Sequence, residues 1–251
     1  MNVIIAGELP FVQEVANLCH EAGHTTTAYL VEDFYDALES GYVQHLENVD
    51  VLIELHNESK MGKQELLMGL TAALPPTALL LTSALCASTT EIASWTSIPS
   101  RVVGIGLIPP IEAGGIVELA SALQTHPRAL AEAQAFWGEL GLESVIVKDG
   151  PGLVRARTLC CLINEAVTVL MEGVATAADI DKAMQLGTNY PRGLLEWADT
   201  IGLDAVLGVM NGLHEEWGDG RYRPSPLLKR MVLAGKFGRK TGEGFFNYEC
   251  E

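Results

Sequence analysis

The chain has 251 residues, of which 48% are hydrophobic, and carries a formal net charge of −16. That length is sufficient for one large domain or two smaller ones with a sizeable core. The strong negative charge argues against a nucleic-acid partner and against binding to an anionic membrane surface.

The cysteines and the apolar segments indicate the cellular compartment of the protein. Five cysteines, including the adjacent Cys160 and Cys161, lack the spacing of a metal site, so we expect reduced thiols and a cytoplasmic protein. No signal-peptide pattern precedes the first predicted strand. The long uncharged stretch 66–90 is interrupted by Pro75 and Pro76, so we expect no transmembrane helix.

Apolar, β-branched segments alternate with helix-like segments over the first 150 residues. The predicted strands are residues 3–6, 25–30, 49–55, 78–82, 102–108, 116–119 and 144–148. The predicted helices are residues 10–22, 34–46, 60–73, 90–95 and 126–141. This alternation predicts an α/β domain over 1–150 with a mainly parallel, Rossmann-like doubly wound sheet.

The pattern changes at the segment 149–152, which reads DGPG. Beyond it, apolar residues recur at helical spacing, as in Leu159, Leu162, Ile163, Ala166, Val167 and Leu170. Further helices are predicted at 179–186, 193–201 and 203–217. We therefore expect a domain boundary near residue 150 and an all-α domain over 151–251.

The first segment, NVIIAGELPFV over residues 2–12, indicates a short strand, a glycine and a proline-led helix. This is the outline of a dinucleotide-binding turn from which most of the glycines are missing. Two interpretations stay open at this point. The segment is either an altered cofactor turn or an ordinary strand–helix turn.

Several long motifs in the C-terminal part resemble one family. They are LINEAVTVLMEGVATAADIDKAMQLG (162–187), ADTIGLD (198–204), RYRPSPLLKRMVLAG (221–235) and GRKTGEGFFNYE (238–249). They resemble the α-helical domain of NAD-dependent L-3-hydroxyacyl-CoA dehydrogenases, which include 3-hydroxybutyryl-CoA dehydrogenases. Weaker anchors are TEIA (90–93), RVVGIG (101–106), VEL (117–119) and PGLV (151–154). The resemblance thus covers the whole chain and implies an NAD-binding domain followed by a dimerising helical domain.

The resemblance places the first glycine of the cofactor turn at Gly7 and the other two at Leu9 and Val12. A leucine side chain obstructs the close approach of a pyrophosphate to the backbone. Pro10 removes one of the N–H groups that would face the anion, and Glu8 adds a negative charge. These replacements predict that the turn no longer accepts a dinucleotide in the family's manner.

Other cofactor contacts of the family can be located in the same way. The acidic residue that holds the adenosine ribose falls on Leu30, and Glu32 or Asp33 could replace it only if the strand end is shifted. The motif ELHNESKMGK (54–63) keeps two family-like residues. The predicted cofactor-binding remnants are therefore Gly7, Glu58 and Lys63. On balance we expect no cofactor, although the family uses NAD.

The catalytic group is also altered. The resemblance places the substrate-orienting serine at Leu85, the general base at Gly106 and a further asparagine at Ala156, whereas the carboxylate that orients the base remains as Glu118. Loss of several members of one catalytic group is close to total loss of activity. In addition, only residues 31–50 separate the second and third strands, where the family carries a longer helical segment that contacts CoA. These differences predict a catalytically degenerate homologue with a structural or regulatory role.

A different hypothesis is an active enzyme with a rebuilt interdomain site for a small substrate, CoA-linked or not. Its candidate residues are His56, Glu58, Cys86 and Glu118. Each has a plainer interpretation: His56 as an exposed loop histidine, Cys86 as a buried thiol, and Glu118 as a carboxylate that is solvated or paired with an arginine. A third hypothesis is an NAD-dependent 3-hydroxyacyl-CoA dehydrogenase that works by unusual means.

Two further patterns concern metals and partners. His20 and His24 have a metal-like spacing, but Gly23 interrupts the helix between them, so we expect no metal. Apolar residues of the C-terminal part pack helices and, by the resemblance, also form the dimer contact; they are Trp197, Leu203, Val206, Leu207 and Met210. We therefore expect a homodimer, or a heteromer with an active relative, through the helical domain.

Overall fold

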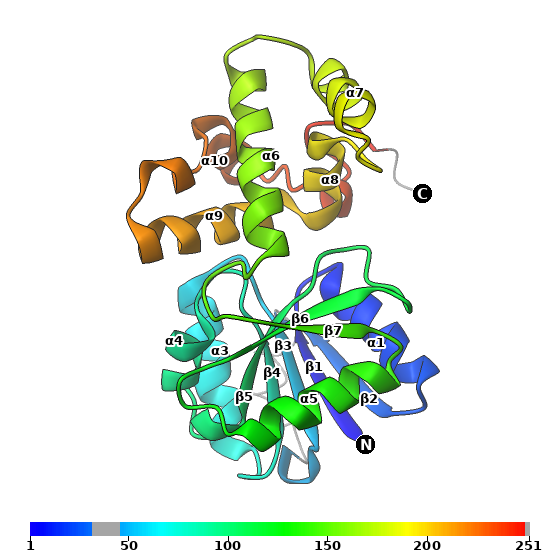
Figure 1. Cartoon of the computed structure of the whole chain (residues 1–251), viewed down its shortest axis with the longest axis vertical. Coiled ribbons are helices and arrows are strands. Elements are labelled where there is room, and N and C mark those ends of the chain that lie inside the picture. Colours follow the sequence, from blue (N-terminus) through cyan, green and yellow to red (C-terminus); the bar gives the residue numbers. More distant parts are fainter. Residues whose placement is uncertain (32–45, 249–251) are drawn as a thin grey trace.

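The computed structural model describes residues 1–31 and 46–248. It has a lower α/β part built on one sheet and an upper part made of helices, joined by the segment that leads into α6 (Figure 1). This confirms the predicted fold class. The division of the chain into 1–150 and 151–251 stays a prediction.

The α/β part alternates strands with helices along the chain. Its strands are β1 (Asn2–Gly7), β2 (Thr25–Leu30), β3 (Val51–Leu55), β4 (Leu79–Ser83), β5 (Val102–Gly106), β6 (Ile116–Ser121) and β7 (Glu143–Val147). Its α-helices are α1 (Phe11–Glu21), α3 (Lys60–Ala73), α4 (Thr89–Ser94) and α5 (Pro127–Glu139), and short 3₁₀ turns occupy Leu46–Asn48 and Pro99–Arg101. The seven strands found in the described residues lie in the order β2-β1-β3-β4-β5-β6-β7.

The central strands are buried on both faces, as expected for a sheet covered by helices on each side. Every residue of β3 and of β4 is buried. Ile53 belongs to the core that contains α1 and α5, and its neighbour Leu52 belongs to the core that contains α3 and α4. Successive side chains of one strand therefore pack against opposite helix layers.

One strand direction differs from a purely parallel sheet. β5 and β6 pair antiparallel, with Gly106 opposite Glu118, whereas β6 and β7 pair parallel. The link between β5 and β6 is a short loop, and a parallel connection would need a longer crossover. The predicted strand 102–108 accordingly ends at Gly106. This register places Glu118 beside the end of β5.

The helical part surrounds α6. Its α-helices are α6 (Arg155–Met171), α7 (Ala177–Thr188), α8 (Leu194–Ile201), α9 (Leu203–Trp217) and α10 (Pro226–Leu233), with 3₁₀ turns at Gly220–Tyr222 and Arg239–Thr241. Figure 1 shows α6 in the middle of the group, with α8 on one side and α9 and α10 on the other. No helix of the described chain is long and apolar enough to cross a membrane.

Helix α9 connects the two parts through two glycines. A Cβ atom added at Gly208 would lie 2.0 Å from the carbonyl oxygen of Asn57, and one added at Gly212 would lie 2.1 Å from that of Cys86. Asn57 and Cys86 follow β3 and β4, so the helix rests directly on the loops at the carboxyl ends of these strands. Only glycine permits backbones to approach so closely.

Several predicted elements agree with the structure to the residue. The strand 25–30 and the helix 60–73 have the predicted bounds. Helix α10 was not predicted, although Pro226 in its first turn is a common start signal. The predicted helix 34–46 lies, apart from Leu46, outside the described residues.

Candidate functional site

Polar side chains from three loops meet at the carboxyl ends of the strands. The backbone N–H of Asn57, after β3, donates to Oε1 of Glu8, after β1, at 3.0 Å. Ser83, at the end of β4, donates its hydroxyl to Oδ1 of Asn57. The carboxyl edge of a parallel sheet is where α/β proteins bind ligands. These contacts fix the three loops to one another at that edge.

A pocket of about 230 Å³ opens at this edge. It is lined by Gly7, Glu8, Leu9, Leu30, Val31, His56, Glu58 and Lys240. The first seven residues belong to the α/β part, whereas Lys240 comes from the 3₁₀ turn near the end of the helical part. The pocket is therefore built by both parts of the molecule.

His56 is buried in this cluster rather than exposed on a loop, as the plainer interpretation had it. Its Nδ1 lies 3.2 Å from Oε2 of Glu8. Burial acts to lower the pKa of His56, but its interaction with Glu8 and the charge of Glu54 outweigh burial and raise the pKa. The Nε2 atom has no hydrogen-bond partner among the described residues and packs against Gly62. The carboxylates therefore favour a positively charged imidazolium.

Lys63, a predicted cofactor contact, does not line the pocket. Its side chain is fully buried, and Nζ donates to the Glu54 carboxylate and, at 2.9 Å, to the His56 carbonyl. Glu54 also accepts from the His56 backbone N–H at 2.6 Å and from the Thr82 hydroxyl. This buried pair fixes the loop that carries His56. Whether Lys63 contacts a cofactor stays a prediction.

Glu58 faces the pocket and joins the two parts of the molecule. Its Oε1 accepts from Nζ of Lys240 at 2.8 Å, and Lys240 also pairs with Asp204 at the start of α9. Burial, and next the hydrogen bond with Glu58, raise the pKa of Asp204 to about 7. Asp204 and Lys240 were not among the predicted site residues, because nothing in the sequence indicates that they approach Glu58.

Two of the remaining predicted cofactor positions, Gly7 and Leu30, lie among the described residues. A Cβ atom on Gly7 would lie 2.7 Å from the backbone of Leu55, so the glycine is required by the pairing of β1 with β3. Leu30, at the ribose position, lines the pocket. Glu32 and Asp33 lie outside the described residues.

The predicted catalytic positions gather around the end of β5. A Cβ atom on Gly106 would lie 2.8 Å from Oε2 of Glu118 and 3.0 Å from Cδ1 of Leu153. The Glu118 carboxylate thus occupies the space beside the backbone from which the family's base would project. Leu85 and Ala156, which replace the serine and the asparagine, are buried in the core.

Glu118 is buried and is neither solvated nor paired with an arginine side chain in the described part of the chain. Its two oxygens accept from the backbone N–H of Arg155, at 3.1 and 3.2 Å, and so hold the start of α6. Burial raises the pKa of Glu118, and the hydrogen bond from Arg155 opposes that shift. A carboxyl group with a raised pKa is a better proton acceptor when ionised.

A second pocket, of about 360 Å³, lies between the loop after β5 and the helical part. Its apolar lining comes from Ile108, Val154, Leu159, Leu162, Tyr190, Pro191 and Trp197, and Arg155 and Thr158 also line it. Trp197 donates its indole N–H to the Pro109 carbonyl at 3.4 Å, which fixes α8 against the loop. Glu118 and Gly106 do not line this pocket, but Arg155, whose backbone N–H contacts Glu118, does.

The other candidates from the sequence are not brought together. Cys86 lines neither of these pockets but a third one, of about 340 Å³, beside Lys60 and Gly212. It is buried, and burial raises its pKa to about 11, so the thiol is protonated near neutral pH. His24 stacks on Phe136, whereas His20 is exposed. The described residues contain no group of side chains suited to a metal ion.

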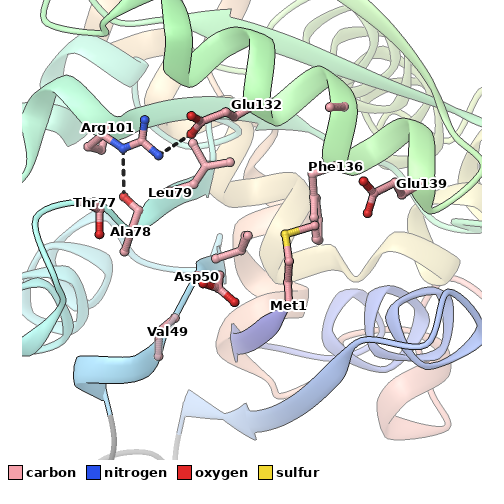
Figure 2. A pocket seen from close by; sticks show the side chains of 12 residues that line it. Met1, Val49, Asp50, Thr77, Ala78, Leu79, Arg101, Glu132, Phe136 and Glu139 are labelled. Carbon is pink, nitrogen blue, oxygen red and sulfur yellow. Dashed lines mark hydrogen bonds and ion pairs between the residues drawn. The ribbon is translucent and has the colours of Figure 1, made fainter.

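Figure 2 shows a larger pocket, of about 390 Å³, at the opposite end of the sheet. There Arg101 pairs with Glu132 of α5 and donates to the Ala78 carbonyl at 3.3 Å. Met1 and Asp50 lie across the opening from them (Figure 2). This pocket lies at the amino ends of β3 and β4, away from the helical part. Because α/β sheets bind ligands at their carboxyl ends, we assign no substrate to it.

The Rossmann-like sheet, the helical domain after it and the pockets between them define a two-domain protein of the dehydrogenase class. The chain belongs to the 3-hydroxyacyl-CoA dehydrogenase family: the model of the family's NAD binding domain matches residues 14–150, and that of its C-terminal domain matches residues 152–248. This confirms the predicted family.

Individual relatives support the same assignment. The probable 3-hydroxybutyryl-CoA dehydrogenase of Bacillus subtilis is 39% identical over 82% of this chain and 72% of that protein. The 3-hydroxybutyryl-CoA dehydrogenase of Bradyrhizobium diazoefficiens is 38% identical over 81% of this chain and 69% of that protein. The crystal structure of (S)-3-hydroxybutyryl-CoA dehydrogenase PaaH1 from Ralstonia eutropha matches with a TM-score of 0.76 and 30% identity, covering 99% of both chains.

These findings contradict two predictions made from the sequence. The relatives are dehydrogenases, and the matched domain is an NAD-binding domain, so the predicted non-catalytic subunit and the predicted lack of a cofactor are wrong. The first prediction took the replacements at Leu85, Gly106 and Ala156 as a loss of activity, whereas the structure keeps the surviving carboxylate of Glu118 buried beside Gly106. The second gave too much weight to the turn at Leu9 and Pro10, because a dinucleotide is held along the whole carboxyl edge of a sheet.

Proposed function

We propose that the chain is an NAD-dependent dehydrogenase that interconverts a short-chain 3-hydroxyacyl-CoA and the corresponding 3-oxoacyl-CoA. Relatives at 38% and 39% identity carry the name 3-hydroxybutyryl-CoA dehydrogenase, which supports this class of substrate. The structural observation that carries the proposal is the position of Glu118, a buried carboxylate beside Gly106 and at the start of α6. It supplies a proton acceptor where the family's base is replaced by glycine.

The carboxyl-edge pocket fits part of the cofactor. Its two basic groups, His56 and Lys240, can each approach an anionic phosphate. Both groups are paired with carboxylates, so an anion would exchange with Glu8 and Glu58 as their partners. At about 230 Å³ the pocket holds one portion of a dinucleotide, and the rest would extend along the sheet edge. When bound, NAD supplies the acceptor for the hydride.

Residues of the chain transfer the proton, bind the acyl group and position the base. In the oxidation direction the Glu118 carboxylate accepts the proton of the 3-hydroxyl group, and in the reduction direction its carboxyl group returns that proton. The apolar pocket beside Ile108 and Trp197 contacts the acyl group. The N–H of Arg155 holds the Glu118 carboxylate in place.

The decisive experiment compares the wild type with Glu118→Gln and, as a matched control, Glu143→Gln, an exposed carboxylate on β7. We expect the wild type to oxidise NADH with acetoacetyl-CoA, Glu118→Gln to lose about 10²- to 10⁴-fold in kcat, and the control to keep its rate. The wild-type kcat for 3-hydroxybutyryl-CoA should fall as the pH is lowered through the raised pKa of Glu118, and the variant should lack that fall. No turnover by the wild type, or an unchanged kcat in Glu118→Gln, contradicts the proposal.

The partner and the location follow as further parts of the proposal. Exposed apolar side chains on and near α6 and α7 support a homodimer through the helical domain; they include Met171, Val174 and Leu186. The four cysteines among the described residues are free thiols, which supports a reducing, cytoplasmic setting.

A further inference from the structure

The apolar pocket between α6 and the loop after β5 contains one charge. Arg155 is the single charged residue that lines it within the described chain. Its guanidinium donates from Nη1 to the Ile116 carbonyl at 3.3 Å and forms no ion pair with a described carboxylate, although its charge acts to lower the pKa of the nearby Glu118. Arg101, which lines the pocket at the opposite end of the sheet, is by contrast paired with Glu132. The Arg155 guanidinium therefore has donors available for an anion.

The helix presents this charge together with an apolar wall. Arg155, Thr158, Leu159 and Leu162 follow the spacing i, i+3, i+4, i+7 and so lie along one face of α6. Opposite them, Tyr190 and Trp197 supply two aromatic side chains. The volume of about 360 Å³ is at the lower end for pockets that enclose small organic ligands. The pocket thus offers an apolar, aromatic-lined interior with one cation.

The charge of the whole molecule makes this local cation significant. With a net charge of −16, the protein repels anions at long range. An anionic group can bind only where a local positive charge outweighs that field. Arg155 also stands at the first turn of a long helix, whose dipole adds positive potential there.

We propose that this pocket selects substrates whose apolar or aromatic acyl portion carries a free carboxylate, which pairs with Arg155. The role of the pocket in selecting a substrate rests on the proposed dehydrogenase function, but its binding preference does not. A carboxylate on the acyl group would form a charge-assisted pair with the guanidinium, while the remainder of the group contacts Tyr190 and Trp197. An unsubstituted acyl chain gains only the apolar contacts.

Binding of two matched probes to the full chain tests the preference without any cofactor. The probes are 3-phenylpropionate and the neutral 3-phenylpropan-1-ol, measured by calorimetry. We expect the wild type to bind the carboxylate about tenfold more tightly than the alcohol. Arg155→Met should lose that preference, Arg155→Lys should keep most of it, and the control Arg128→Met, an exposed arginine on α5, should keep all of it.

Equal affinity of the wild type for both probes, binding of neither probe, or an unchanged preference in Arg155→Met overturns the proposal. A crystal structure of the wild type with 3-phenylpropionate gives a test that needs no variant. It should show the carboxylate within hydrogen-bond distance of the Arg155 guanidinium, and density elsewhere counts against the proposal. Failure of the dehydrogenase function would appear separately, as an absence of turnover with acetoacetyl-CoA while the binding preference is unaffected.

Discussion

Protonation of Asp204 affects the contact between the two parts of the molecule, because this residue pairs with Lys240 beside Glu58. Burial raises its pKa to about 7, and Glu58 and Lys240 are the charged groups that face it. The native protein therefore binds a proton at Asp204 over a pH range in which the unfolded chain, with an ordinary pKa near 4, has released it. Stability from this group is present at low pH and is lost as the pH rises towards 7.

Asp204→Asn should remove this pH dependence. Between pH 5 and pH 8, we expect the free energy of unfolding of the wild type to fall by on the order of 1 to 2 kcal/mol relative to that of Asp204→Asn. This corresponds to a fall of roughly 2 to 8 °C in the melting temperature. Thermal unfolding followed by circular dichroism at several pH values measures the difference. Asp219→Asn, a surface carboxylate paired with Arg221, is the control and should parallel the wild type. If the melting temperature of Asp204→Asn changed with pH in the same way as that of the wild type, Asp204 would not be the source of the pH dependence.

Single residues also show where the sequence was informative about the site and where it was not. His56 was a candidate because it follows a predicted strand, and Glu58 and Glu118 were candidates because the family resemblance places functional carboxylates at these positions. The pairing of Glu8 with His56 and that of Glu58 with Lys240 were not predictable, because the partners are far apart in the chain. Only the folded backbone brings them together.

At the scale of elements, the glycines of α9 determine how closely the helical part approaches the sheet. The sequence predicted this helix with its observed bounds, since its apolar residues recur with helical spacing. Its contact with the loops after β3 and β4 could not be predicted, because a glycine within a helical sequence does not reveal which other segment packs against it. The antiparallel direction of β6 was also missed, because apolar alternation carries no information on strand direction.

Gly212→Ala tests that contact. The added Cβ would lie 2.1 Å from the Cys86 carbonyl oxygen, so we expect a loss of about 1 to 3 kcal/mol, or roughly 2 to 12 °C in melting temperature. Gly187→Ala in α7 is the matched control. There an added Cβ meets nothing within 4 Å, and the change should stabilise the protein by about 0.5 to 1 kcal/mol. Equal effects of the two substitutions would show that helix propensity, not the contact, decides the outcome.

At the scale of the whole molecule, the helical domain exposes apolar side chains to solvent. The side chains of Val174 and Leu186 are 69% and 77% exposed, and a pocket of about 340 Å³ lies between α6 and α7 near Val174. Exposed apolar side chains beside an apolar pocket are a candidate interface between proteins. The family resemblance had already indicated this domain as the dimer contact.

The double substitution Val174→Asp and Leu186→Asp should therefore convert a dimer into a monomer. Light scattering after size exclusion should give the wild type twice the chain mass of 27.0 kDa and the variant that mass alone. Leu123→Asp, at a 92% exposed leucine of the α/β part, should leave the dimer intact. A monomeric wild type would exclude the proposed homodimer.

The hydrogen bond between the Trp197 indole and the Pro109 carbonyl has an optical consequence. Trp197 is half-buried at the junction between α8 and the loop after β5, whereas Trp137 is fully buried under the sheet. If the helical part moves away from the sheet, the Trp197 indole enters water and its emission shifts to longer wavelength, while Trp137 keeps its environment. With Trp95 and Trp217 replaced by phenylalanine, Trp197 would report separation of the two parts and Trp137 would report unfolding.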